Sequence, residues 1–202
     1  RDLCRDVVLI PRDGHGAGGW LEPGKTRGFH SRIMDEQVEY WLDRRHFDVV
    51  QVEYTHMAHF LPRPVPGLLR VLVEHDVTFV AQRRAREIAT STPRRLNLWY
   101  DGLKTLRHEV AAVESADLVL TMSDDDRASL ARYVDPAPLV TIPNGVSCRD
   151  FPLRSATDEE PATILFVGFF RHEPNVEAVL WFARDVLPKI RERRPDAIFR
   201  VV

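Results

Sequence analysis

A histidine and an aspartate close one of the apolar segments that the sequence predicts as β-strands. His75 and Asp76 lie at the end of "LLRVLVEHDV", residues 68–77. In parallel sheets, ligands bind beyond the carboxyl ends of the strands, so both side chains are candidates for a ligand site. A histidine there could orient a hydroxyl group or assist charge movement in a reaction. A histidine hydrogen-bonded to the backbone at a strand end is the simpler interpretation, which the chemistry alone favours.

The preceding strand, predicted over residues 47–54, ends in a second group of polar side chains. Glu53, His56 and His59 occur in "VEYTHMAHF", where their types suggest metal ligands. The HExxH zinc pattern is absent, and ligand number and spacing fall short of a metal site. We therefore expect no metal here. We interpret Glu53, His56 and Asp76 as contacts to a substrate, with a solvated face as the alternative.

A glycine and an arginine follow a strand predicted later in the chain. In "VGFFRHEPN", Gly168 permits close approach of a ligand to the backbone, and Pro174 suits the first turn of a helix. The free N–H groups of a helix start, with Arg171 nearby, fit a phosphate or a diphosphate. Many ordinary turns between a strand and a helix carry the same residue types, so that alternative stays open.

Two other stretches invite a functional interpretation. The stretch "DGHGAGGW" (13–20) is rich in glycine but matches neither GxGxxG nor a Walker loop, so a flexible loop is favoured. A basic patch is formed by Arg83, Arg84, Arg86, Arg94 and Arg95. This patch could meet an anionic lipid surface or an acidic acceptor, and a solvated helix face is the default interpretation.

Short apolar segments alternate with helical ones along the chain. Strands are predicted at 6–11, 47–54, 68–77, 116–123 and 138–143. Helices are predicted at 31–45, and over most of 79–115 with a break near Pro93. Ser31 and Ser123 are predicted N-caps, and residues 12–30 are predicted as a loop. Continuously apolar strands that alternate with helices are typical of a parallel sheet covered on two faces, the doubly wound α/β class.

The composition of the chain changes after residue 143. Residues 151–162 contain two prolines and no apolar period, which predicts a linker, and a βαβ pattern then restarts with "TILFVG". We predict a Rossmann-like N-terminal domain over 1–143, an interdomain linker over 144–161, and the start of a second Rossmann-like domain over 162–202. Because the chain lacks an initiating Met and ends inside a predicted strand, we expect a fragment of a longer protein.

The composition also limits the function. The 202 residues are 44% hydrophobic and carry a formal net charge of −2, which gives no reason to expect a nucleic-acid partner. Cys4 and Cys148 lack metal-ligand spacing, so we expect a reduced, cytoplasmic protein. No apolar run approaches the roughly 20 residues that span a bilayer. The protein could still contact the inner face of the membrane peripherally, without crossing it.

The order of these segments resembles the GT-B fold glycosyltransferases, in particular the retaining, nucleotide-sugar-dependent group called family four. The resemblance rests on "FDVVQVEY", "VEHDV", "ESADLVLTMSDDDRASL", "VTIPNGVSCRDF" and "ILFVGFFRHEPNVEAVLWFARDVLPKI". The run "IPNGV", followed by a linker and "ILFVG", is the most specific part. The resemblance spans most of residues 47–202 and implies an acceptor-side domain followed by a donor-binding domain.

The resemblance also implies a reaction. The parent enzyme would transfer a sugar from a nucleotide-diphosphate sugar to a hydroxyl of a sugar, polysaccharide or lipid-linked acceptor, with no cofactor and no obligatory metal. His75 matches a family histidine near the reacting sugar, and Gly168 and Arg171 lie in the loop expected to bind the donor diphosphate. Phe169 occupies the place of a family arginine, so the charge must come from Arg171 or from elsewhere. Since two family elements are expected outside this chain, we expect the chain by itself to be inactive.

Two other functions stay open. A non-catalytic or degenerate GT-B module would bind a nucleotide sugar or a partner protein without turnover, and Phe169 slightly favours it. A nucleotide-sugar epimerase would share the architecture but would need no separate acceptor. Donor binding without turnover would identify the module, and product analysis would identify the epimerase.

Overall fold

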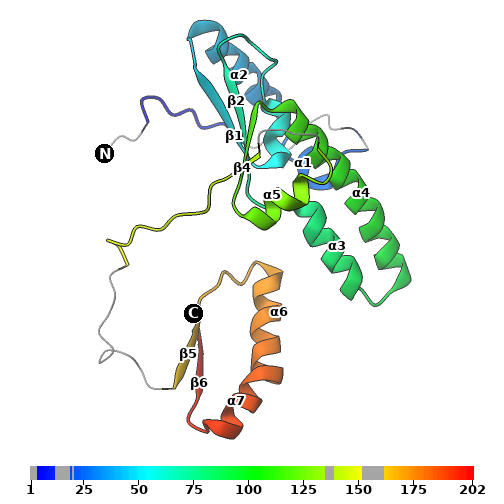
Figure 1. Ribbon diagram of the computed structural model, residues 1–202, viewed down its shortest axis with the longest axis vertical. Helices are drawn as coiled ribbons and strands as arrows, with labels where there is room; N and C mark the ends of the chain where they lie inside the picture. Colours follow the sequence, from blue (N-terminus) through cyan, green and yellow to red (C-terminus); the bar gives the residue numbers. More distant parts are fainter. Residues whose placement is uncertain (1–3, 12–18, 20, 135–138, 152–161) are drawn as a thin grey trace. The chain divides into compact units, whose positions relative to one another are not determined.

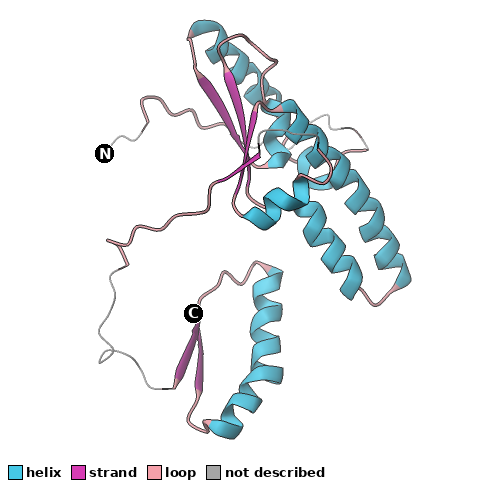
Figure 2. Cartoon of the chain, in the orientation of Figure 1, coloured by secondary structure: helices cyan, strands magenta, loops and turns pink. Residues whose placement is uncertain are grey.

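Two separate units make up the fold of the chain. The computed structural model describes residues 4–11, 19, 21–134, 139–151 and 162–202. Unit 1 is Arg1–Gly145 and unit 2 is Val146–Val202, and each is described here by itself. Figure 1 labels their helices and strands, and Figure 2 shows that both units combine helices with strands.

A four-stranded parallel sheet forms the centre of unit 1, with the strand order β1-β2-β3-β4. The strands are β1 (Val49–Glu53), β2 (Leu69–Glu74), β3 (Leu118–Thr121) and β4 (Leu139–Thr141). Leu72 of β2 and Val119 of β3 are register partners, and both are completely buried. Burial of the central strands on both faces explains why their sequences are continuously apolar. The predicted parallel α/β fold is confirmed.

Helices supply the rest of the core of unit 1. They are α1 (Gly24–Arg27), α2 (Arg32–Arg44), the 3-10 helix η1 (Thr55–Phe60), α3 (Thr78–Ile88), α4 (Thr92–Ser115) and α5 (Asp124–Leu130). Val113 of α4 and Leu130 of α5 have no exposed surface and belong to the same cluster as Leu72 and Val119. Full burial of such a side chain contributes about 1.5–3 kcal/mol. These contacts hold α4 and α5 to the sheet.

The predicted helix starts agree with the structure where a local cap is present. The Ser31 side chain accepts a hydrogen bond from the Met34 N–H at 3.4 Å, and the Ser123 side chain accepts one from the Asp126 N–H at 3.1 Å. The predicted break near Pro93 separates α3 from α4, and this proline lies in the first turn of α4. A proline is tolerated there because the first-turn N–H groups have no partner within the helix.

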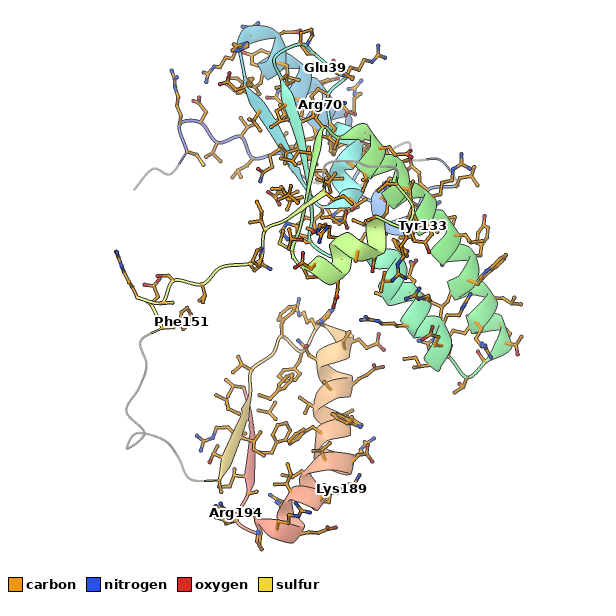
Figure 3. All side chains as sticks on the ribbon, in the orientation of Figure 1. Glu39, Arg70, Tyr133, Phe151, Lys189 and Arg194 are labelled. Carbon is orange, nitrogen blue, oxygen red and sulfur yellow. The ribbon has the colours of Figure 1, made fainter. Side chains whose placement is uncertain are left out.

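An ion pair fixes the amino end of the sheet, opposite the edge where parallel sheets bind ligands. Arg70, labelled in Figure 3, is the second residue of β2 and donates to both carboxylate oxygens of Asp117, at 3.0 and 2.7 Å. The Asp117 N–H in turn donates to the Arg70 carbonyl at 2.9 Å. This bidentate pair ties β2 to the residue that precedes β3.

The predicted buried strand over residues 6–11 is wrong. The structure has no strand in this segment, and Val7 and Leu9 are 71% and 89% exposed. Apolar, β-branched residues favour a strand when a neighbouring strand offers a hydrogen-bonding partner and a covered face. Among the described residues, β1 pairs only with β2, so residues 6–11 find no such partner.

The predicted loop over residues 12–30 is partly wrong, because it contains the short helix α1. Apart from Gly19, the glycine-rich stretch 13–20 lies outside the described residues. The same is true of most of the predicted linker, residues 152–161.

Unit 2 is one parallel βαβ arrangement. Strands β5 (Thr163–Phe166) and β6 (Ile198–Val201) pair in parallel. Between them run α6 (Glu173–Trp181), a π-helical turn (Phe182–Val186) and α7 (Leu187–Arg193). The side chains of Leu187 and Ala197 are buried in this unit. The loop from β5 to α6 carries the predicted donor-binding residues.

Candidate functional site

A paired histidine and glutamate lie at the carboxyl ends of β1 and β2. Nε2 of His75 donates a hydrogen bond to Oε2 of Glu53 at 2.7 Å. The other carboxylate oxygen of Glu53 accepts from the Gln51 side chain at 2.5 Å. When Nε2 of a neutral imidazole carries the proton, Nδ1 is left as an acceptor. The contact with Glu53 therefore favours the tautomer of His75 in which Nδ1 is a hydrogen-bond acceptor.

Tyr54 packs against the histidine of this pair. Its ring stacks on the His75 ring with centroids 4.1 Å apart and an interplanar angle of 27°. The backbone of Tyr54 has φ 71°, a left-handed conformation that is uncommon outside glycine. The Tyr54 N–H donates to the Val73 carbonyl at 2.9 Å, which holds this conformation in place. Strained backbone of this kind is often found at functional sites.

A pocket of about 250 Å³ lies beside this pair. Its lining comes from α1, η1, α3, α4 and the end of β2, and includes Tyr54, His56 and Asp76. His56 and Asp76 were predicted as substrate contacts, and the structure brings both to the pocket wall. Tyr54 lines the pocket and stacks on His75, so it connects the pocket to the histidine–glutamate pair.

Two buried carboxyl groups lie in the wall of this pocket. Glu74 and Glu109 are each only 2% exposed. Burial raises the pKa of Glu74 to about 9, and the nearby carboxylates of Glu109 and Asp76 add to the rise. At neutral pH Glu74 is therefore a neutral carboxylic acid that can both donate and accept. Its Oε2 atom has no hydrogen-bond partner among the described residues.

Glu109 has a different role, since it caps a helix. Its two carboxylate oxygens accept from the backbone N–H groups of Thr78, at 2.8 Å, and Phe79, at 3.3 Å. The residue before α3, Val77, has no side-chain cap, so Glu109 on α4 takes that role. Burial raises the pKa of Glu109 to about 7, while the two N–H groups oppose the rise.

Several other polar atoms in the pocket wall are buried without a partner. In the part of the chain that the structure describes, they are Thr55 Oγ1, Gln82 Oε1, Thr105 Oγ1 and His108 Nε2. A buried polar atom without a hydrogen bond costs roughly 1–3 kcal/mol, so native proteins rarely keep a group of them empty. A ligand with several hydroxyl groups, or water in its absence, would satisfy them. The pocket wall therefore offers several unsatisfied hydrogen-bonding atoms to a polar ligand or to water.

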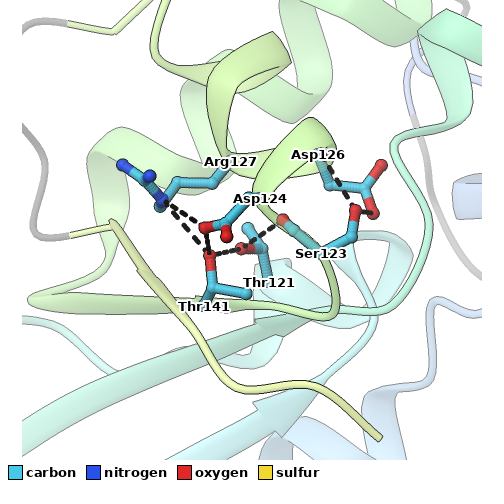
Figure 4. A network of polar contacts seen from close by, with 6 residues as sticks. All are labelled: Thr121, Ser123, Asp124, Asp126, Arg127 and Thr141. Carbon is cyan, nitrogen blue, oxygen red and sulfur yellow. Dashed lines mark hydrogen bonds and ion pairs between the residues drawn. The ribbon is translucent and has the colours of Figure 1, made fainter.

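Hydroxyl and carboxylate groups tie the ends of β3 and β4 together (Figure 4). Oδ1 of Asp124 accepts from Oγ1 of Thr141 at 2.8 Å and from Nε of Arg127 at 3.3 Å. The hydrogen bonds from Thr141 and Arg127 lower the pKa of Asp124. Oγ1 of Thr121 donates to the Ser123 carbonyl at 3.2 Å. Because these groups bond one another, we assign them a supporting role at this edge of the sheet.

Glu53 and His59, whose residue types suggested metal ligands, make other contacts in the structure. Glu53 binds His75, and the ring of His59 stacks on that of His30 with centroids 3.9 Å apart. Burial and the nearby His30 lower the pKa of His59 to about 4, so it is neutral at physiological pH. Within the described ranges, no group of three or more histidine, cysteine or acidic side chains is arranged to hold a metal ion.

The predicted diphosphate loop of unit 2 is closed by contacts of its own. A Cβ on Gly168 would lie 2.6 Å from a ring carbon of Phe166, so this position needs glycine to accommodate that ring. Nδ2 of Asn175 donates to the Phe169 carbonyl at 3.1 Å, across the loop. Arg171 is exposed just before α6. The binding of a diphosphate at Gly168 and Arg171 stays a prediction.

Sequence reasoning missed the most deeply buried part of the pocket. Glu74 and Glu109 were hidden in apolar segments, "RVLVEHD" and "RHEVAAVE". A carboxylate inside an apolar period is a signal, since ionisable groups are rarely buried unless they are paired or functional. Thr105 offered no signal, because nothing in its sequence context distinguishes it from a threonine on a helix surface.

A parallel α/β domain with a polar pocket at the carboxyl ends of its strands defines a Rossmann-like domain, and this edge is where sheets of this type bind their ligands. The family model of Glycosyltransferase Family 4 matches residues 3–150 of the chain, and the chain belongs to this family. A domain of this family implies a sugar donor and an acceptor substrate in general terms. A search of curated proteins found no match.

Proposed function

We propose that the chain is part of a transferase that moves a sugar from a nucleotide-diphosphate sugar to an acceptor hydroxyl, and that unit 1 holds the acceptor. The observation that carries this proposal is the juxtaposition of the His75–Glu53 pair with a pocket lined by buried, unpartnered polar atoms. Family membership supplies the reaction class. The acceptor is a sugar, a polysaccharide or a lipid-linked sugar.

In this proposal the histidine–glutamate pair serves the reacting hydroxyl. Glu53 accepts a hydrogen bond from Nε2–H of His75 and thereby fixes the tautomer, so that Nδ1 can accept a hydrogen bond from the substrate. The carboxylate also stabilises positive charge that develops on the imidazole during the reaction. Proton transfer by a positioned group of this kind contributes about 10²–10⁴-fold to a rate.

The pocket itself would hold the acceptor ring through its hydroxyl groups. Protonated Glu74 can donate to one hydroxyl, while Thr105 Oγ1 and His108 Nε2 offer further hydrogen-bonding positions. Each hydrogen bond made to an otherwise unpartnered buried atom removes its desolvation cost, which favours a polyhydroxylated ligand over an apolar one. The pocket requires neither a cofactor nor a metal in this proposal.

Substitution of one buried hydroxyl tests the acceptor pocket. Thr105→Val keeps the side-chain shape but removes Oγ1, so we expect binding of simple methyl glycosides to weaken about 3–10-fold, the loss of one hydrogen bond. The measurement is a ligand titration followed by saturation-transfer NMR on the purified chain, with a panel of methyl hexosides as probes. Thr92→Val, at the exposed start of the same helix, is the matched control. Equal binding by Thr105→Val and Thr92→Val would contradict this assignment.

A degenerate module that binds a nucleotide sugar without turnover remains the second candidate. Two observations favour it: Phe169, 68% exposed, stands where the resemblance places an arginine, and the surrounding loop is closed by the Asn175–Phe169 hydrogen bond. In that case a donor would bind but no product would form. The expected inactivity of the 202-residue chain by itself also stays a prediction, which turnover by the purified chain would refute.

A further inference from the structure

The far end of the α3–α4 hairpin is exposed on both of its helices. Helices α3 and α4 lie side by side and are joined by a short turn (Figure 1). The buried residue of α3 is Phe79, near its start, and those of α4 begin at Thr105. Residues 83–103, here called the distal hairpin, therefore contribute no buried side chain to the core. Packing of the core therefore does not determine which side chains these residues carry.

An apolar stripe runs along the α4 side of the distal hairpin. Leu96, Trp99, Tyr100 and Leu103 have the spacing i, i+3, i+4 and i+7, which places them on one helix face. They are 61%, 49%, 42% and 46% exposed, and Ile88 at the end of α3 is 78% exposed. A continuous exposed apolar stripe of this kind marks an interaction surface.

The charge around this stripe has one predominant sign. The distal hairpin contains Arg83, Arg84, Arg86, Arg94 and Arg95. The acidic residues of the distal hairpin are only Glu87 and Asp101. The hairpin is therefore basic, although the whole chain has a formal net charge of −2. Among the described residues, none of the five arginines takes part in an ion pair. Their charge is thus available to an external anionic partner.

We propose that the distal hairpin docks on the surface of an anionic lipid bilayer. Tryptophan and tyrosine favour the boundary between headgroups and acyl chains, and leucine enters its apolar side. Long arginine side chains can bury their stems and still reach lipid phosphates, so each basic residue near such a surface adds to the attraction. Among the described residues, no helix is long and apolar enough to cross a membrane. The inference goes beyond the proposed function and does not depend on catalysis.

A helical hairpin with exposed arginines fits a lipid surface better than it fits an acidic protein. Its apolar residues Leu96, Trp99 and Leu103 lie along one exposed helix face. A protein partner would need its own groove to cover that stripe, whereas a fluid bilayer takes the shape of the helix. The combination of aromatic residues, leucines and arginines on one helix is typical of interfacial helices.

Vesicle binding tests the inference on the purified 202-residue chain. The probes are vesicles of phosphatidylcholine alone and of phosphatidylcholine with phosphatidylglycerol at 3:1, sedimented with the protein at low salt. We expect at least tenfold stronger binding to the anionic vesicles, and a similar loss in 0.5 M NaCl. The double substitution Arg94→Glu with Arg95→Glu should lower binding at least tenfold. Trp99→Ala should weaken binding while leaving the salt dependence in place.

A matched pair of substitutions controls for total charge. Arg184→Glu with Arg193→Glu makes the same change at exposed positions of unit 2. We expect this control to keep most of the binding. Failure to bind anionic vesicles, or equal losses in both double variants, would overturn the proposal. So would a change of oligomeric mass, without vesicles, caused by Arg94→Glu and Arg95→Glu while vesicle binding persists, since the hairpin would then join two copies of the chain.

Discussion

At the scale of single residues, the pocket depends on a carboxyl group that is buried and forms no ion pair with any described residue. Glu74 is 2% exposed, and its raised pKa of about 9 means that it folds as a neutral acid. An unpaired carboxylate at this position would oppose folding, because burial disfavours the charged form. The same neutral acid gives the pocket a hydrogen-bond donor that an ionised carboxylate could not supply.

This arrangement predicts how stability depends on pH. In the unfolded chain Glu74 ionises near its usual pKa of 4.5, whereas in the folded chain it stays protonated to about pH 9. Its contribution to stability is therefore complete below pH 4.5 and is lost as the pH rises toward 9. Glu74→Gln removes this titration, so at pH 8.5 we expect the variant to be more stable than the wild type by at least about 1 kcal/mol. Thermal unfolding of both proteins at pH 5.5 and 8.5 measures the effect.

The exposed Glu39→Gln, on α2 and labelled in Figure 3, is the control for a change in net charge. We expect Glu39→Gln to show the same change in stability between pH 5.5 and pH 8.5 as the wild type. A wild-type protein and a Glu74→Gln variant that lose the same stability between pH 5.5 and 8.5 would show that Glu74 does not fold as a neutral acid.

At the scale of elements, the start of α3 depends on a residue from another helix. Glu109 accepts two N–H groups of α3, so Glu109→Ala leaves two buried donors without partners. We expect a loss of about 2–4 kcal/mol in the free energy of unfolding, measured with urea. Glu109→Gln keeps one acceptor oxygen and should cost less than half as much. Glu114→Ala, at an exposed position of the same helix, should cost under about 0.5 kcal/mol.

The contrast among helix starts shows what a sequence can reveal about elements. Ser31 and Ser123 cap their helices through N–H groups three residues away, so local sequence was enough to predict both. The cap of α3 comes from a residue 31 positions later, and no local pattern points to it. The segment 6–11 failed for the same reason, because its strand propensity needed a partner strand that local sequence does not supply. Elements that depend on residues far away in the sequence could therefore not be predicted from local sequence.

At the scale of the whole molecule, parallel topology explains which parts of the site were predictable. The carboxyl ends of parallel strands meet at one edge, so Glu53 and His75 could be expected near each other, and they form a hydrogen bond at 2.7 Å. The rest of the pocket is lined by α1, η1, α3 and α4, whose placement depends on packing. Thr105 therefore became visible as a site residue only in the folded chain.

The central claim is that this edge of the sheet performs sugar transfer. The most direct measurement is a transfer assay with the protein expressed from its whole reading frame, using panels of nucleotide-sugar donors and sugar or lipid-linked acceptors, with products detected by mass spectrometry. We predict transfer by the wild type, and a loss of about 10²-fold or more in His75→Asn with donor binding retained. Donor binding without transfer by the wild type, or unchanged transfer by His75→Asn, would contradict the account.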